Sequence, residues 1–300
     1  MNVKVLYILG TQRGGTTIAG RVAGALPGFA YGGEMHRLWE RGVGTEVRCG
    51  CGQRLAACPV WSRAMPAALA GTDAALARAW QRAAAPDRAS AGKLARLLSG
   101  RRGDADAKYA ALTGRVYAAF ADATNARVVV DASKLPTDAY VAAKSGVDAY
   151  VLHVVRDPRG IAYSLARRAD AEAHAHPRQV MLASALWAGR NATAVALRHV
   201  VGADRFLTLR YEDLAADPSG TMARVACFVG EDAVLPVGTD GTVLLPTAHT
   251  PTGEGRFVAR PVALSEDRAW VAALGAADFR LTTALTAPMR WRYGYRAARP

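Results

Sequence analysis

The sequence is short of acidic residues relative to basic ones. Its 300 residues carry 25 acidic and 38 basic side chains, which gives a formal net charge of +13 and a pI of about 10.1. Such an imbalance suits an anionic partner: a phosphate-containing cofactor, a nucleic acid or a membrane surface. The alternative explanation of the positive charge is a general bias of the composition toward Arg and Ala, without an anionic partner. The basic residues are scattered, and Arg101-Arg102 is only a pair, so a polybasic segment is not indicated.

Long apolar runs are also missing. No run approaches the roughly 18 apolar residues of a transmembrane helix. Residues 3–9 are apolar, but this segment is short, has only Lys4 near its start and leads into a glycine-rich turn, unlike a secretory signal. We therefore expect a cytoplasmic protein without a membrane partner. With 51% hydrophobic residues, a single domain over residues 1–300 with one large insertion is expected.

Cysteine is scarce, with four residues at Cys49, Cys51, Cys58 and Cys227. The first three form the pattern Cys-x-Cys-Gly…Cys-Pro-x-Trp. Three ligands at this spacing are too few for a structural zinc site, which normally has four, so we expect no bound metal. Free thiols are the first expectation in a reducing compartment. A disulfide from Cys58 to Cys49 or Cys51, or a metal site, stays open as an alternative.

Apolar stretches alternate with helical stretches along the chain. We expect buried strands at 3–9, 127–131, 150–155 and 205–209, and helices at 16–26, 136–145, 158–168, 178–200 and 219–228. Strands that are almost continuously apolar and separated by helices are typical of a parallel sheet with helices on both faces. The sequence therefore predicts an α/β fold in which residues 60–125 form a helical insertion. Residues 28–60 and 230–262 are expected to be irregular.

The most informative motif follows the first expected strand. Residues 5–17 read Val-Leu-Tyr-Ile-Leu-Gly-Thr-Gln-Arg-Gly-Gly-Thr-Thr, a strand, a glycine-rich turn and a helix start. The backbone N–H groups of such a turn favour an anion, and Arg13, Thr16 and Thr17 add a charge and two hydroxyl donors. Gly10 and Gly15 have the spacing of an ATP-binding P-loop, but Thr16 stands where that loop has its Lys. The turn therefore predicts a phosphate site unlike that for the β- and γ-phosphates of ATP.

A second anion site is indicated after a later strand. Arg156 ends the strand at 150–155, Asp157-Pro158 is a good helix entry, and Ser164 lies on the first turns of that helix. An Arg offers a bidentate fork to a phosphate, and Ser164 can reach the same group. Because ligands of parallel sheets bind at the carboxyl ends of the strands, we expect Arg156, residues 131–134 and Tyr211 to gather at the edge that carries the glycine turn.

Taken together, the two motifs resemble the cofactor signatures of sulfotransferases that use 3′-phosphoadenosine 5′-phosphosulfate (PAPS). Residues 13–17 resemble the 5′-phosphosulfate loop of that family, [KR]-[ST]-G-T-[TS], with Gly14 in place of the usual Ser. Arg156 and Ser164, eight positions apart, resemble the 3′-phosphate motif. The resemblance implies a P-loop-like sulfotransferase fold. It also implies a nucleotide-binding set of Arg13, Gly14, Gly15, Thr16, Thr17, Arg156 and Ser164.

Further segments extend the resemblance over nearly the whole chain, apart from residues 60–125. Tyr211-Glu-Asp-Leu is similar to a family motif whose Tyr contacts the cofactor, and residues 131–136 resemble a segment whose Lys, here Lys134, contacts the transferring sulfonate. Residues 249–257 resemble the loop Gly-Asn-Pro-x-Arg-Phe that closes on the 3′-phosphate, which implicates Gly253 and Arg256. In that loop Glu254-Gly255 replaces Asn-Pro. The cysteine pattern also recurs in bacterial members.

The chemistry of the cofactor fits two separate anion sites, because PAPS carries a phosphosulfate at one end and a 3′-phosphate at the other. Sulfonate transfer should resemble phosphoryl transfer, with catalysis by positioning and charge stabilisation, for which Arg13 and Lys134 are the candidates. No metal is required, and adenosine 3′,5′-bisphosphate is the product. Glu34 matches the catalytic Glu of tyrosylprotein-type sulfotransferases. His36 is the competing general base, and a structural role for Glu34 also stays open.

Two other functions are weighed against this one. A P-loop kinase or ATPase with a degenerate loop would use residues 128–131 as its Walker B strand and bind ATP with magnesium, but the Walker A Lys is missing. A basic polyanion-binding protein would leave the glycine loop unexplained, so a nucleic-acid partner is not expected. For the acceptor we expect a small molecule, such as a bacterial secondary metabolite, or a carbohydrate, and a lipid or a peptide Tyr stays open. The oligomeric state is not indicated.

Overall fold

The computed structural model describes residues 3–42, 46–84, 92, 95, 99–100, 103–169, 177–253 and 255–296. Its centre is a five-stranded sheet in the order β2-β3-β1-β4-β5, and all neighbouring strands are parallel. The strands are β1 (Lys4–Gly10), β2 (Phe29–Gly33), β3 (Val128–Lys134), β4 (Asp148–Val155) and β5 (Phe206–Arg210). The predicted α/β fold with a parallel central sheet is therefore confirmed.

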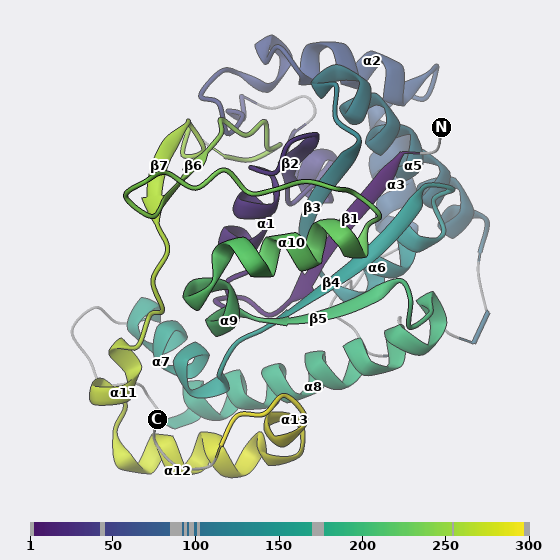
Figure 1. The fold of residues 1–300 in the computed structure, drawn as a ribbon. Helices are drawn as coiled ribbons and strands as arrows, with labels where there is room; N and C mark the ends of the chain where they lie inside the picture. Colours follow the sequence, from purple (N-terminus) through teal and green to yellow (C-terminus); the bar gives the residue numbers. More distant parts are fainter. Residues whose placement is uncertain are drawn as a thin grey trace.

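Alternate residues of β1 point into two separate cores, one on each face of the sheet. Leu6 and Ile8 pack with α1 (Thr16–Ala23) and α10 (Pro218–Phe228), which lies in front of the sheet in Figure 1. Val5, Tyr7 and Leu9 pack in the other core with α5 (Asp104–Thr124), α6 (Pro136–Ala143) and α8 (Pro177–Val201). Because both faces are covered, the strands read as nearly continuous apolar runs in the sequence.

The helical insertion lies between β2 and β3. Two short helical turns, at Leu38–Gly42 and Leu55–Ala57, precede α2 (Trp61–Leu69) and α3 (Ala74–Ala84). Both α2 and α3 pack on α5, and α5 in turn contacts β2, β3 and α6. The described helices of the insertion thus contribute to the core that α5 and α6 share.

Two segments expected to be irregular contain strands. β2 pairs with β3 at the edge of the sheet, in the register Phe29↔Val128. Its sequence, Phe-Ala-Tyr-Gly-Gly, is short and glycine-rich, so pairing with β3 rather than local propensity makes it a strand. Further along, β6 (Thr242–Leu245) and β7 (Arg260–Ala263) form an antiparallel pair inside the region predicted as loop. The partner of each strand lies outside any local sequence window.

The C-terminal helices α11 (Ala269–Ala273), α12 (Ala276–Leu285) and α13 (Ala287–Arg292) lie beside α7 (Pro158–Ala169) and α8, with α12 and α13 along α8 at the bottom of Figure 1. In the described part of the chain, one stretch of α8, Arg178–Val201, is long and apolar enough to cross a membrane. That is weak evidence, because core helices pass the same test. Here α8 packs on α6, α7, α12 and β1 and buries Val180, Trp187 and Leu197.

Candidate active site

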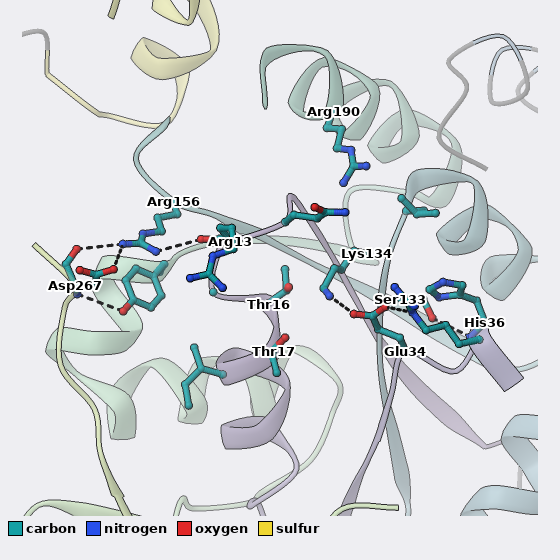
Figure 2. A pocket seen from close by; sticks show the side chains of 16 residues that line it. Arg13, Thr16, Thr17, Glu34, His36, Ser133, Lys134, Arg156, Arg190 and Asp267 are labelled. Atoms are coloured by element: carbon teal, nitrogen blue, oxygen red, sulfur yellow. Dashed lines mark hydrogen bonds and ion pairs between the residues drawn. The ribbon is translucent and has the colours of Figure 1, made fainter. Parts of the chain in front are cut away.

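All five strands of the sheet end at the same edge, and the chain that leaves each strand contributes to one cavity of about 600 Å³. β1 is the central strand, and the chain adds β2 and β3 on one side of it and β4 and β5 on the other. Open α/β sheets bind their ligands at the carboxyl ends of the strands beside such a reversal of strand order. Figure 2 shows the side chains that surround this cavity. The predicted site residues that line it are Arg13, Gly15, Thr16, Thr17, Glu34, His36, Lys134, Arg156 and Tyr211.

The lining of the cavity is strongly cationic. Its acidic side chains are Glu34 and Asp267, whereas its basic ones are Arg13, Arg37, Lys134, Arg156 and Arg190. Low-dielectric walls lined by one sign of charge concentrate the field and raise the local concentration of counter-ions. The cavity is therefore suited to a polyanionic ligand.

The glycine turn has the geometry of an anion cradle. Arg13 and Gly15 both adopt left-handed backbone conformations, with φ of 63° and 83°. Gly15 is the N-cap of α1, and no side chain caps this helix end. Backbone N–H groups at the start of a helix then face the cavity, where an anion can accept them. A Cβ on Gly15 would lie 2.4 Å from Cδ2 of Tyr211, so this position requires glycine for space as well as for conformation.

The departure at Gly14 also has a structural reason. The amide of Gly14 donates a hydrogen bond to the carbonyl oxygen of Thr11 at 3.1 Å, which closes the turn. A Cβ on Gly14 would lie 2.9 Å from both that oxygen and Oγ1 of Thr11. A Ser at this position would therefore push the turn open, and the hydroxyls of Thr16 and Thr17 remain the side-chain donors on this stretch.

Glu34 follows the carboxyl end of β2 and lies next to Lys134 (Figure 2). Lys134 donates a hydrogen bond to Oε1, and Nε of Arg37 donates to Oε2 at 2.5 Å. Burial by itself would raise the pKa of Glu34, but the charges and hydrogen bonds of Lys134 and Arg37 outweigh it and hold the pKa below its ordinary value. Glu34 is therefore ionised at neutral pH and able to accept a proton.

The buried carboxylate of Asp131 holds the residues next to Glu34 and Lys134 in place. Asp131 on β3 accepts hydrogen bonds from Tyr117 Oη at 2.7 Å, from the amide and hydroxyl of Ser133 at 2.8 and 2.5 Å, and from the amide of Met35 at 3.4 Å. Burial raises the pKa of Asp131 to about 6, against the effect of these donors. Because Ser133 and Met35 adjoin Lys134 and Glu34, Asp131 positions both catalytic candidates.

His36 reaches the same cavity from the segment that carries Glu34. Its amide donates to Oγ of Ser133 at 3.2 Å, and its carbonyl oxygen accepts from Gln81 Nε2 at 2.7 Å. The backbone of His36 is thus tied to β3 and to α3. Both candidate bases line the cavity, so geometry keeps both within reach of an acceptor.

Arg156 organises the other end of the cavity. Its guanidinium lies 4.8 Å from the centre of the Tyr211 ring, donates to the carbonyl oxygen of Arg13 at 3.1 Å, and pairs with the Asp267 carboxylate at 3.0 Å. Nε of Arg13 donates to Oγ of Ser164 at 2.7 Å. Arg13 is therefore associated with the Arg156 and Ser164 group, whereas Lys134 is associated with Glu34.

Four of the predicted site residues do not line the cavity. Ser164 accepts a hydrogen bond from Arg13, which lines the cavity, and Gly14 stands between Arg13 and Gly15 in the sequence. Gly253 and Arg256 do not line the cavity: Arg256 is exposed, and a Cβ on Gly253 would lie 2.2 Å from the Cα of Gly50. Their loop packs against the cysteine segment, and a cofactor role for them stays a prediction.

Three charged residues of the site were missed from the sequence. Arg37 follows Glu34 by three positions, and that spacing was a usable signal. Asp267 comes from a C-terminal loop without a motif. Arg190 points into the cavity from α8 (Figure 2), and burial lowers its pKa. Nothing in the sequence distinguishes Arg190 from the other arginines of this basic chain.

The protein is thus an α/β protein with a parallel sheet of this order and a P-loop-like turn that lacks the P-loop Lys. The charge of its cavity suits phosphate-type anions. The model of the sulfotransferase family matches residues 6–234. The chain therefore belongs to the sulfotransferase family.

One solved structure supports the assignment at the level of the fold, and two others are compared only by their measured similarity. The sulfotransferase domain from the curacin biosynthetic pathway superposes with a TM-score of 0.55 at 15% identity, covering 99% of both chains. The sulfotransferase domain of the olefin synthase from Synechococcus PCC 7002 has a TM-score of 0.49 at 21% identity, covering 96% of this chain and 94% of that one. A sulfotransferase from Mycobacterium avium has a TM-score of 0.49 at 15% identity, covering 99% and 78%. A search of curated proteins finds no match.

Proposed function

We propose that this protein is a cytoplasmic enzyme that transfers a sulfonate group from PAPS to a hydroxyl or amine of a small molecule or carbohydrate. The observation that carries the proposal is the Glu34–Lys134 pair, which faces the same cavity as the uncapped N-terminus of α1. A proton acceptor, a cation and an anion cradle are the parts that sulfonate transfer from a phosphosulfate requires.

The residues present fit the donor. Thr16, Thr17 and the backbone at the start of α1 would hold the phosphosulfate, and Arg156 and Ser164 would hold the 3′-phosphate. The sequence assigned Arg13 to the phosphosulfate loop, but its hydrogen bond to Ser164 favours a place beside the 3′-phosphate. Tyr211 adjoins both groups, since its ring contacts Arg156 and lies against Gly15. PAPS, when bound, supplies the sulfonate group and leaves as adenosine 3′,5′-bisphosphate.

The chain's own residues then have distinct tasks. Glu34 accepts the proton of the acceptor hydroxyl or amine, because it is ionised and lines the cavity. Lys134 stabilises the negative charge that develops as the acceptor attacks, and in turning to that charge it leaves Oε1 of Glu34 open to the acceptor. Arg37 keeps Oε2 of Glu34 in place throughout.

The competing magnesium-ATP function fits less well. Asp131, the candidate Walker B carboxylate, is buried and accepts hydrogen bonds from Tyr117 and Ser133, and it does not line the cavity. A carboxylate engaged in this way does not point at a nucleotide-bound metal. This favours PAPS over ATP as the ligand.

Calorimetric titration tests the donor directly. Adenosine 3′,5′-bisphosphate without magnesium should bind more tightly than ATP with or without it, at both low and high salt, and Arg156→Ala should abolish the preference. Tighter binding of magnesium-ATP, or binding of neither nucleotide, would overturn the proposal. Binding of both that falls steeply with salt would favour the polyanion-binding alternative.

A matched pair of variants tests the base. Glu34→Gln keeps the size of the side chain and removes its ability to accept a proton, so turnover of PAPS should fall by about 10²-fold or more while binding of the bisphosphate persists. His36→Gln should retain most of the turnover. The reverse result would make His36 the base.

A further inference from the structure

A second cluster of chemically active side chains lies apart from the cavity. Three of them are Cys49, Cys51 and Cys58, and the fourth is His249, which is 191 positions from Cys58 in the sequence. The four ligand atoms all lie within 4.8 Å of one another. Cys49 and Cys58 are fully buried, and Cys51 and His249 are partly buried. The sequence supplied only three ligands at this position, and the fold supplies the fourth.

The distances suit a tetrahedral metal site. With Zn–S near 2.3 Å and Zn–N near 2.0 Å, the edges of a tetrahedral zinc site are about 3.8 Å between sulfurs and about 3.5 Å between sulfur and nitrogen. Sγ of Cys51 and Sγ of Cys58 are 3.9 Å apart, and Sγ of Cys58 and Nδ1 of His249 are 3.2 Å apart. A disulfide would need about 2.05 Å between sulfurs, and all three cysteines are free. A bound metal ion therefore accounts for the distances between the sulfur atoms better than a disulfide bond does.

The backbone around the cysteines is folded into a tight loop. The amide of Cys49 donates a hydrogen bond to the carbonyl oxygen of Gln53 at 2.8 Å. The amide of Gly52 donates to the carbonyl oxygen of Cys49 at 2.9 Å. Gly52 has a φ of 93°, a conformation that glycine adopts without strain. Two cysteines separated by one residue thereby lie on the same side of the turn as Cys58.

His249 is held in place from the other side of the cluster. Its carbonyl oxygen accepts a hydrogen bond from Nε1 of the buried Trp61 at 2.9 Å. Its loop is joined to the cysteine loop by backbone hydrogen bonds from Gly50 to Thr250 at 3.1 Å and from Phe257 to Gly50 at 3.0 Å. The ligand set is therefore assembled by the folded backbone itself.

We propose that Cys49, Cys51, Cys58 and His249 bind one zinc ion in a closed structural site. Four protein ligands leave no position for a substrate, which distinguishes structural from catalytic zinc. Thiolates combined with an imidazole in a tetrahedral arrangement favour zinc over the hard cations magnesium and calcium. The site is independent of the proposed reaction, which needs no metal.

The ion would join two parts of the chain that are far apart in sequence, the cysteine segment and the loop that contains His249. It links the start of the helical insertion to the loop that contains Thr250, and Thr250 packs on Gly33, where a Cβ would lie 2.6 Å from Cγ2 of Thr250. Gly33 immediately precedes Glu34. Zinc binding would therefore stabilise the contact between Thr250 and Gly33 that positions Glu34. The free energy of zinc binding would also contribute to the stability of the fold.

Metal analysis of the purified full-length protein tests the proposal. We expect one zinc per chain by plasma mass spectrometry in the wild type and in Cys227→Ser, the matched control whose cysteine is exposed and outside the cluster. His249→Ala should weaken zinc affinity at least about tenfold in competition with a chromogenic chelator. Wild-type protein without zinc, or His249→Ala with unchanged affinity, would overturn it.

A second measurement avoids the need for a variant that folds. Cobalt(II) added to wild-type protein freed of metal should produce a thiolate-to-cobalt charge-transfer absorption that saturates at one equivalent and is displaced by zinc. Absence of that absorption would overturn the proposal, as would a disulfide between cluster cysteines in protein digested without reductant. Because neither readout involves PAPS or turnover, failure here is distinguishable from failure of the proposed function.

Discussion

The carboxylate of Glu34 accepts a hydrogen bond from Lys134, which joins the carboxyl ends of β2 and β3 across 100 positions of sequence. Arg37 contacts the second oxygen of the same carboxylate. The candidate base is thus restrained by two cations, one of which is also the candidate for stabilising the transferred group. We infer that the strength of Glu34 as a base increases when Lys134 turns to a bound donor, since the pKa of Glu34 rises as a cation leaves it.

The first prediction concerns the pH dependence of turnover. Arg37→Gln removes one cation from Glu34 and leaves Lys134 in place, so burial is opposed less strongly and the pKa of Glu34 rises. Glu34 must be ionised to accept a proton. The acidic limb of the profile of kcat/KM against pH should therefore move to higher pH.

A charge-matched variant is the control for this shift. Arg115→Gln removes the same charge from a side chain that hydrogen-bonds to the Ala68 carbonyl oxygen in the insertion. It should leave the acidic limb where it is in the wild type. An unmoved limb in Arg37→Gln would mean that another group titrates, with His36 the first to examine.

The second prediction concerns the ion pair between Arg156 and Asp267. The Asp267 carboxylate, about half exposed, lies where it would repel a phosphate that approaches Arg156. Asp267→Asn should therefore tighten binding of adenosine 3′,5′-bisphosphate, by up to about fivefold at low salt, given the modest energies of exposed pairs. Calorimetry measures the change. Asp232→Asn, which removes an exposed charge elsewhere, should have no effect, and weaker binding in Asp267→Asn would show that the carboxylate assists the site.

The third prediction uses two glycines with the same backbone conformation. Gly15 and Gly71 both have a φ of 83°, but only at Gly15 would a Cβ collide, with the ring of Tyr211. Each substitution by Ala carries about 1–2 kcal/mol of backbone strain. Only Gly15→Ala should lose binding of the bisphosphate, because Tyr211 or the start of α1 must move. Equal binding in both variants would contradict the contact.

The cavity could be anticipated from the sequence because its parts follow apolar strands directly. Arg13, Lys134 and Arg156 lie at or just after the ends of such strands, and a parallel sheet brings those ends to one edge. Glu34 was predicted from its place one helix after the glycine turn and from its match to the catalytic Glu of the family. Its strand, β2, was not predicted, because it is too short and glycine-rich to be recognised by pattern. Pairing with β3 decides its structure, and pairing is not a local property.

Residues that act across the fold could not be found in this way. His249 joins the cysteine cluster from a loop late in the sequence, so a count of cysteines alone left a metal site only as an open alternative. Arg190 reaches the cavity from the middle of α8. The sequence of this apolar helix does not distinguish Arg190 from its other arginines. Asp267 meets Arg156 only because the C-terminal helices return beside α7. In each case the signal is a spatial neighbour rather than a spacing.

The last prediction concerns the stability of the fold and the buried carboxylate of Asp131. Its pKa is raised from 3.8 to about 6 by burial, so between these values the folded protein binds a proton at this site that the unfolded chain has released. The free energy of unfolding should therefore fall as pH rises from about 3 to about 7, by about 3 kcal/mol from this group. Asp131→Asn removes the titration and keeps an oxygen that can accept from Ser133.

Urea unfolding at several pH values gives the measurement, as the difference between wild type and Asp131→Asn. Other groups, such as His153, whose pKa burial lowers to about 4, change stability in the opposite direction over this range, but they are present in both proteins and cancel in the difference. The difference should be largest near pH 3, where the protonated wild-type carboxyl is favoured, and should decline to a plateau above about pH 7. Parallel curves would mean that Asp131 stays ionised throughout, held by the donors from Tyr117 and Ser133, and that burial does not dominate at this position.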